Sequence, residues 1–346
     1  MLDYFKRDAQ DEAFYETYLA GRLPANLIDA HMHINLPEHV AAISDETIRG
    51  DWAMECGIVM TCEDACAYHQ TLFPRQSVRF IGLPMPIREA DLAANNAYLA
   101  ELKKQYDWLP PFAHRVQPLM GIRPEWSAET VEQVLLEGGF AGFKPYPYMA
   151  AAEKGAEVSI FDFLPHAHLA VAERHHKVVL LHLPRRGRLA DKENIREIRE
   201  IVQTYPSIKL VLAHFGRCFN PIYFERGLDQ LGSDLPALYF DTAAVLNPQV
   251  HQMALERLSI RQILFGTDLP IMLWHGRRRW TETEYINLCR EHFNWNKHLE
   301  PEAEAGYTLF VYEQIKAMLD TLAAARDPQQ AIQAVFHDNA AAVYGM

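Results

Sequence analysis

Long apolar runs are missing from this sequence. No uninterrupted hydrophobic stretch approaches the roughly 20 residues that a helix needs to span a bilayer. The first residues, MLDYFKRDAQDEAFYE, are too acidic and polar for a secretory signal. We therefore expect a cytoplasmic protein with no membrane partner.

Cysteine is scarce, and its spacing excludes two kinds of structure. The 346 residues include five cysteines, an odd number, and none of them forms a CxxC pair. A disulfide framework needs an even set, and structural zinc sites typically use paired cysteines. We expect neither, and we interpret the thiols as buried and inert.

Positive charge is also in short supply. Lys and Arg total 33 against 45 Asp and Glu, which gives a formal net charge of -12. Proteins that bind nucleic acid usually neutralise phosphates with a basic surface, so this class of partner is excluded. The hydrophobic content of 49% is instead typical of a globular protein with a large core.

What the sequence does contain, from residue 27 onward, is a regular alternation. Short apolar runs rich in β-branched and aromatic residues alternate with segments of helical periodicity, which predicts a parallel sheet with crossover helices. Eight such runs are present, the number that closes a (β/α)8 TIM barrel of the α/β class. The predicted strands are Leu27–Ile34, Gly57–Thr61, Val116–Gly121, Gly139–Tyr146, Val178–His182, Lys209–His214, Leu238–Thr242 and Gln262–Asp268.

No linker divides the chain, so we predict a single domain over residues 1–346. Two stretches interrupt the rhythm and are predicted insertions: residues 63–115 after strand 2, and residues 269–335 after strand 8. The second is expected to be helical and to fold over one end of the barrel. Residues 1–26 are expected to form a helical extension. Helices are predicted at Ser127–Glu137, Phe161–Glu173, Lys192–Tyr205 and Val250–Leu258.

Two histidines end the first predicted strand, in the segment IDAHMH. Side chains on a strand alternate between its faces, so His31 and His33 should point the same way. If that direction is inward, two imidazoles can converge on one metal ion at about 2.0–2.1 Å. The alternative is a pair of partly exposed histidines at an edge.

Later strands also end in polar residues. His182 ends VVLLH, His214 ends LVLAH, and Asp268 ends ILFGTD. Barrel enzymes assemble their catalytic groups at the carboxyl ends of the strands. Each residue alone would be an ordinary hydrogen-bonded side chain, but together they predict one active site.

Six motifs carry a resemblance to a known family. In chain order they are IDAHMH, GFKPYP, LLHLP, LAHFGR, FGTDLP and VFHDNAAAVYG. The set resembles the amidohydrolase superfamily, specifically its amidohydrolase-related branch of metal-dependent hydrolases and of decarboxylases similar to aminocarboxymuconate-semialdehyde decarboxylase. The resemblance covers nearly the whole chain after residue 26.

The resemblance implies a metal centre with one or two ions. His31, His33 and His182 would be its nitrogen ligands and Asp268 its oxygen ligand, with Asp268 also acting as general acid and base. His214 would lie beside the metal as a catalytic residue. We expect one Zn²⁺, although Mn²⁺ and Fe²⁺ accept the same donors.

Lys144 lies on the fourth predicted strand, on the same face as Gly142 and Tyr146. We interpret it as an unmodified cation for a substrate oxygen, with Tyr146 in the pocket wall. The alternatives are a structural lysine and a carboxylated lysine that bridges two ions, which the resemblance implies for binuclear relatives.

Two arginines closely follow predicted site histidines, Arg185 after strand 5 and Arg217 after strand 6. Guanidinium groups bind carboxylates in bidentate geometry, so this pair predicts a small anionic organic substrate. The run Arg277–Arg279 is interpreted as solvated loop charge. Asp241, at the end of the seventh predicted strand, is expected to hold a loop or a ligand in place.

The first functional hypothesis is hydrolysis of an amide, ester or lactone by metal-activated water. The alternative is non-oxidative decarboxylation of an aromatic or unsaturated acid, which the same ligand set can support. A barrel that binds without turnover and a binuclear phosphotriester hydrolase are further alternatives. The family resemblance also suggests a homodimer.

Overall fold

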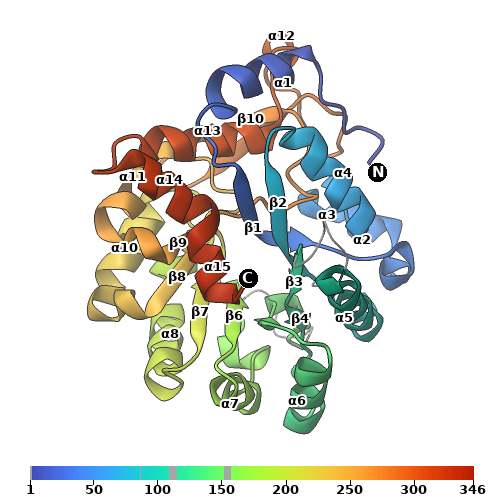
Figure 1. The fold of residues 1–346 in the computed structure, drawn as a ribbon, viewed down its shortest axis with the longest axis vertical. Coiled ribbons are helices and arrows are strands. Elements are labelled where there is room, and N and C mark those ends of the chain that lie inside the picture. Colours follow the sequence, from blue (N-terminus) through green and yellow to red (C-terminus); the bar gives the residue numbers. More distant parts are fainter. Residues whose placement is uncertain (1, 86, 109–114, 152–156) are drawn as a thin grey trace.

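Parallel strands succeed one another in chain order around the molecule (Figure 1). The computed structural model describes residues 2–85, 87–108, 115–151 and 157–346. The strands are β1 (Asn26–His33), β2 (Ser77–Leu83), β3 (Val116–Pro118), β4 (Met120–Gly121), β5 (Gly142–Lys144), β6 (Val178–Leu181), β7 (Lys209–Leu212), β8 (Leu238–Asp241) and β9 (Ile263–Leu264). Only Leu119 separates β3 from β4, so these two form one strand of an eight-stranded set.

Backbone hydrogen bonds join the last strand to the first. The amide of Ala30 donates to the carbonyl of Phe265 at 2.8 Å, and the amide of His33 donates to Leu269 at 2.8 Å. Met32 and Leu269 also form a parallel bridge. With the pairings β1 to β2 to β3 and β4 through β9, these bonds form the ring of the predicted (β/α)8 barrel.

Helices cover the outside of the ring (Figure 1). In α8 an isoleucine recurs every third residue and each is buried, while Asp191 caps the first turn by accepting hydrogen bonds from the amides of Glu193 and Asn194. The helices are α1 (Ala9–Phe14), α2 (Asp45–Gly50), α3 (Trp52–Cys56), α4 (Cys62–Leu72), α5 (Leu92–Trp108), α6 (Ala128–Glu137), α7 (His166–Arg174), α8 (Lys192–Thr204), α9 (His214–Arg217), α10 (Pro221–Leu231), α11 (Pro248–Arg257), α12 (Pro301–Glu304), α13 (Phe310–Leu322), α14 (Pro328–Gln333) and α15 (Asn339–Tyr344).

The last helix closes the amino-terminal end of the barrel. Alternate residues of several strands, such as Val178 and Leu180 of β6, pack with Tyr344 of α15 in one buried cluster. Lys209, the first residue of β7, donates hydrogen bonds to the carbonyls of Ala342 and Val343. Because this end is packed with apolar side chains and a helix, a site can open only at the carboxyl ends of the strands.

The second strand was predicted in the wrong place. Gly57–Thr61 is not a strand but the connection between α3 and α4, and β2 lies at Ser77–Leu83. The predicted insertion at 63–115 therefore contains the strand that it was meant to follow. Both segments are short apolar runs, and periodicity alone does not distinguish a buried connection from a buried strand.

The segment after β9 contains strands as well as helices. β10 (Gly276–Trp280) and β11 (Tyr285–Cys289) pair as an antiparallel hairpin, and α12, α13 and α14 follow. The prediction of a purely helical insertion at 269–335 missed this hairpin. In Figure 1, β10 lies on the same side of the barrel as α1 and α13. No helix in the described parts of the chain is long and apolar enough to cross a membrane.

Candidate active site

A cavity of about 760 Å³ opens at the carboxyl ends of the strands. All five residues predicted as metal ligands or catalytic groups line it: His31, His33, His182, His214 and Asp268. They come from the ends of β1, β6, β7 and β9, so the barrel brings together residues that lie up to 237 positions apart.

An irregularity in β1 directs its two histidines into the cavity. Ile28 and Ala30 belong to the apolar cluster inside the barrel, and strict alternation would turn the odd-numbered residues outward. The register between β1 and β2 shifts between Asp29 and Met32. Such shifts re-aim side chains at barrel rims, which explains why His31 and His33 line the cavity although Ile28 and Ala30 also face inward.

Three imidazoles are held in one tautomer by protein acceptors. The Nδ1 of His33 donates to the carbonyl of Pro84 at 3.1 Å, and the Nδ1 of His214 donates to the carbonyl of Ala243 at 2.8 Å. The Nδ1 of His31 lies 2.8 Å from Asp241 Oδ2. With Nδ1 engaged, Nε2 is the nitrogen that each ring has left for a metal ion, the arrangement that protein metal sites use.

Asp268 lies between the two histidines of β1. Its Oδ1 is 3.5 Å from His31 Nε2 and 3.4 Å from His33 Nε2. One ligand atom from each of these three residues lies within 4.8 Å of the others. Burial alone would raise the pKa of Asp268, but the nearby imidazoles of His214 and His31 lower it well below its usual range. The carboxylate is therefore ionised, as a metal ligand must be.

His182 has an enclosed nitrogen without a partner. Its Nδ1 is buried, and it neither donates nor accepts a hydrogen bond among the described residues. The ring packs against Tyr146 and His214, with centroids 4.4 and 5.3 Å apart. An unpaired buried nitrogen is costly in a folded protein. His182 lines the same cavity as the His31, His33 and Asp268 group, whose donor atoms suit a divalent metal, but it adds no ligand atom to the set that lies within 4.8 Å.

Burial keeps the histidines uncharged. It lowers the pKa of His214 to about 4, and it lowers the pKa of both His31 and His182 well below the usual value. All three rings are neutral near pH 7 and can use their lone pairs.

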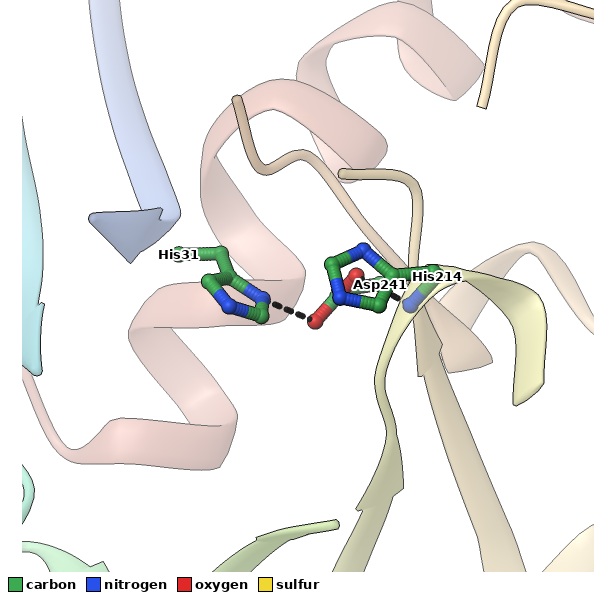
Figure 2. A group of neighbouring side chains, drawn as sticks. All are labelled: His31, His214 and Asp241. Atoms are coloured by element: carbon green, nitrogen blue, oxygen red, sulfur yellow. Dashed lines mark hydrogen bonds and ion pairs between the residues drawn. The ribbon is translucent and has the colours of Figure 1, made fainter. Parts of the chain in front are cut away.

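Asp241 was expected to hold a loop or a ligand in place, and the structure gives it contacts of this kind. Figure 2 shows its carboxylate in contact with the His31 ring, with His214 beside it. The same carboxylate accepts hydrogen bonds from the amides of His214 at 2.7 Å and Ala243 at 3.1 Å. It therefore orients one imidazole and also fixes the backbone turn that carries another. The only signal in the sequence was its place at the end of a predicted strand.

The backbone is strained where the site residues leave the strands. His214 and Asp268 both have positive φ angles, +57° and +68°. Few residues other than glycine adopt this region, and such strain concentrates at functional sites. The turns direct these two side chains into the cavity at the cost of that strain.

Lys144 lies under the site, nearly fully buried. Its Nζ is 3.2 Å from His31 Nε2, the nitrogen that faces the metal-binding group. Burial lowers the pKa of Lys144 to about 8. Tyr146, two residues after Lys144 and just beyond the end of β5, lines the cavity.

The two predicted substrate arginines lie in different places in the structure. Arg217 lines the cavity, but the structure does not bring Arg185 there. Arg185 instead forms a two-pronged ion pair with Glu197 of α8, with both N to O distances 3.0 Å, and bonds Asn194 at 2.7 Å. Its guanidinium is used within the protein, because α8 places a buried carboxylate opposite the loop.

Arg278 was misread from the sequence. It was grouped with its neighbours as solvated loop charge, yet it lines the cavity and is only 5% exposed. The segment GRRRW is strand β10, whose alternation exposes Arg277 and Arg279 and buries the arginine between them. Recognising a strand there would have identified it.

Comparison with known proteins identifies a family and a shared fold. A family model for amidohydrolases matches residues 28–346. A comparison with curated proteins gives no match.

Several solved structures share the fold over most of the chain. 2,6-Dihydroxybenzoate decarboxylase from Rhizobium has a TM-score of 0.57 and 13% identity, covering 93% of this chain and 99% of that one. A probable 2-pyrone-4,6-dicarboxylic acid hydrolase from Acinetobacter baumannii has a TM-score of 0.55 and 14% identity, covering 93% and 100%. 5-Carboxyvanillate decarboxylase from Novosphingobium aromaticivorans, with bound manganese, has a TM-score of 0.59 and 11% identity, covering 95% and 98%.

Proposed function

Because the chain belongs to the amidohydrolase family, whose members are metal-dependent enzymes, we propose that it hydrolyses an amide, ester or lactone bond in a small substrate that carries a carboxylate. The observation that carries this proposal is the ionised carboxylate of Asp268, 3.4 to 3.5 Å from two imidazole nitrogens at the floor of an open cavity.

The residues that would hold the metal are His31, His33, His182 and Asp268. We propose one Zn²⁺. Manganese is bound in the Novosphingobium enzyme, and other divalent ions bind to the same kinds of donor. When bound, the ion would lower the pKa of a water molecule and polarise a substrate oxygen.

The protein's own groups would move the proton and hold the substrate. Asp268 accepts a proton from the attacking water and later returns it to the leaving group. His214, with its Nδ1 proton fixed on Ala243, presents Nε2 as a hydrogen-bond acceptor toward the reacting centre. Lys144 does not line the cavity, but its positive charge next to His31 would stabilise a negatively charged substrate oxygen there.

The first test is metal content. Plasma mass spectrometry should find about one ion per chain in the purified protein and none in a His31→Asn, His33→Asn double variant. With carboxylated lactones and amides as substrates, the metal-loaded protein should incorporate oxygen from isotope-labelled water into the product acid. An active protein without a metal ion would refute the proposal, and two ions per chain would bring Lys144 into the metal site.

Decarboxylation is the second candidate, favoured by the aromatic walls of the cavity. Tyr146, Tyr148, Phe219 and Tyr285 all line it and would suit a flat acid. Two of the similar structures are decarboxylases of substituted benzoates. Release of carbon dioxide from a hydroxybenzoate, with no labelled oxygen entering the organic product, would select this reaction over hydrolysis.

A further inference from the structure

Arg278 is buried without an acidic partner. Its Nε donates to Asn287 Oδ1 across the hairpin at 2.8 Å, and its Nη1 donates to the carbonyl of Ala244 at 2.7 Å. Both acceptors are neutral, and no carboxylate of the described residues forms an ion pair with it. Its Nη2 donates to no protein group that the structure describes. A charge in this position is not stabilised by the fold alone.

Aromatic rings surround this guanidinium, whose orientation is held by the hydrogen bonds of its Nε and Nη1. It lies 4.3 Å from the ring centre of Tyr285, 5.1 Å from Phe310 and 5.2 Å from Phe219. Burial lowers the pKa of Arg278, but only to about 10, so the group remains charged near neutral pH. A charged, planar and pre-oriented guanidinium at the wall of a cavity is suited to a carboxylate.

A second arginine of the same cavity is also without an acid. Arg217 uses Nη1 for the carbonyls of Leu183 and Arg185, while its Nε and Nη2 donate to no described group. A third cation, Arg188, lies over the Phe219 ring at 5.6 Å, and its Nη1 is enclosed without a partner. The acids that line the cavity outside the metal-binding group, Asp51 and Glu89, form no ion pair with any of the three.

We propose that Arg278 and Arg217 form a carboxylate subsite separate from the metal-binding group. This inference rests on the proposed function and specifies its substrate: an acid that presents a carboxylate to the two arginines while its reacting group lies at His31, His33 and Asp268. Arg278 then determines specificity. It comes from the β10–β11 hairpin, which is not part of the barrel ring.

The test measures binding of simple acids to the metal-loaded protein by isothermal titration calorimetry. The probes are isophthalate, which offers one carboxylate to each site, and benzoate, which has only one. Isophthalate should bind at millimolar concentration or below and more tightly than benzoate. Arg278→Gln should weaken isophthalate binding about ten- to a hundred-fold, the range for loss of a charged hydrogen-bonded contact.

Arg277→Gln is the matched control. It removes the same charge from the next position of the same strand, but Arg277 is exposed and lies outside the cavity. Its isophthalate affinity should equal that of the unaltered protein. Arg278→Lys, which keeps the charge and loses the planar fork, should bind with intermediate affinity and serves if the Gln variant does not fold.

The outcomes separate this inference from the proposed function. Metal content is measured on every variant and should not change in Arg278→Gln. Absence of metal in the unaltered protein would refute the metal mechanism, while an effect of Arg278→Gln on acid binding would still support the subsite. Equal isophthalate affinity in Arg278→Gln and Arg277→Gln, or no isophthalate binding to the unaltered protein, would overturn the subsite.

Discussion

At the scale of single residues, the site depends on groups that do not themselves line the cavity. Asp241 is completely buried and contacts His31, the His214 amide and the Ala243 amide. Carboxylates in this position set the tautomer and raise the basicity of a metal-binding imidazole. Its contribution should therefore appear in metal affinity.

We predict that Asp241→Asn weakens metal binding about 10- to 100-fold, because the amide supports the His31 ring less well than the carboxylate does. Competition with a chromophoric chelator measures the change. Asp229→Asn is the control, since Asp229 forms an exposed ion pair with Arg257 on the outside of the barrel. Unchanged metal affinity in Asp241→Asn would show that the carboxylate only supports the backbone.

His275 gives a residue-scale prediction about pH. Burial lowers its pKa, but hydrogen bonds to Asp11 at 2.9 Å and Glu291 at 2.6 Å more than offset this and raise the pKa to about 9. Arg290 adds a further charge to this cluster by contacting both Asp8 and Glu291.

Because the folded pKa of His275 exceeds the unfolded value of about 6.5, the stabilisation is complete below pH 6.5 and is lost as pH rises through about 9. We predict that the free energy of unfolding falls by up to about 3 kcal/mol over this interval. Urea denaturation at several pH values measures it. His275→Gln should be less stable throughout and lack this component; the same pH dependence in the variant would contradict the assignment.

At the scale of elements, the loop after β6 and helix α8 are joined by the Arg185 and Glu197 pair. Glu197 also accepts hydrogen bonds from Ser159 Oγ and the amide of Ile160, so it ties a third segment to the same point. Removing Arg185 would leave the buried carboxylate of Glu197 with only the more exposed Arg196, at 3.3 Å, as a cation.

We predict that Arg185→Gln destabilises the protein by about 3–5 kcal/mol, the cost of breaking one partner of a buried pair, and leaves isophthalate affinity unchanged. Thermal and urea denaturation measure the first effect, and calorimetry measures the second. Arg186→Gln, at an exposed position next to it, should have little effect on stability. A loss of acid binding with normal stability would instead assign Arg185 to the cavity.

The strands and the β10–β11 hairpin also show which features could be predicted from the sequence and which could not. The polar residues at or just after the ends of β1, β6, β7 and β9 were predictable as a set, because several apolar runs that each stop at His or Asp indicate one shared site. β2 was misplaced because two short apolar runs lie close together and only tertiary pairing selects between them. Arg278 was missed because its burial depends on pairing with Asn287, a contact that exists only once the hairpin forms.

At the scale of the whole molecule, the (β/α)8 ring was predictable from the rhythm of strands and helices. The direction in which individual side chains point was not predictable. His31 and His33 enter the cavity through a register shift, and Arg185 is drawn away by a helix residue twelve positions later. Such outcomes depend on which long-range partner is available, and no local pattern encodes that choice.

The buried contact between His275 and Asp11 has a consequence for how this protein could diversify. Through it, helix α1 holds the hairpin that carries Arg278, although α1 lies before the residues that match the family model. The barrel ring, which would hold the metal, and the β10–β11 hairpin, which would select the acid, are thus built from different stretches of chain. If the proposed subsite is correct, changes in the hairpin would alter which acid is accepted while the reactive centre stays intact.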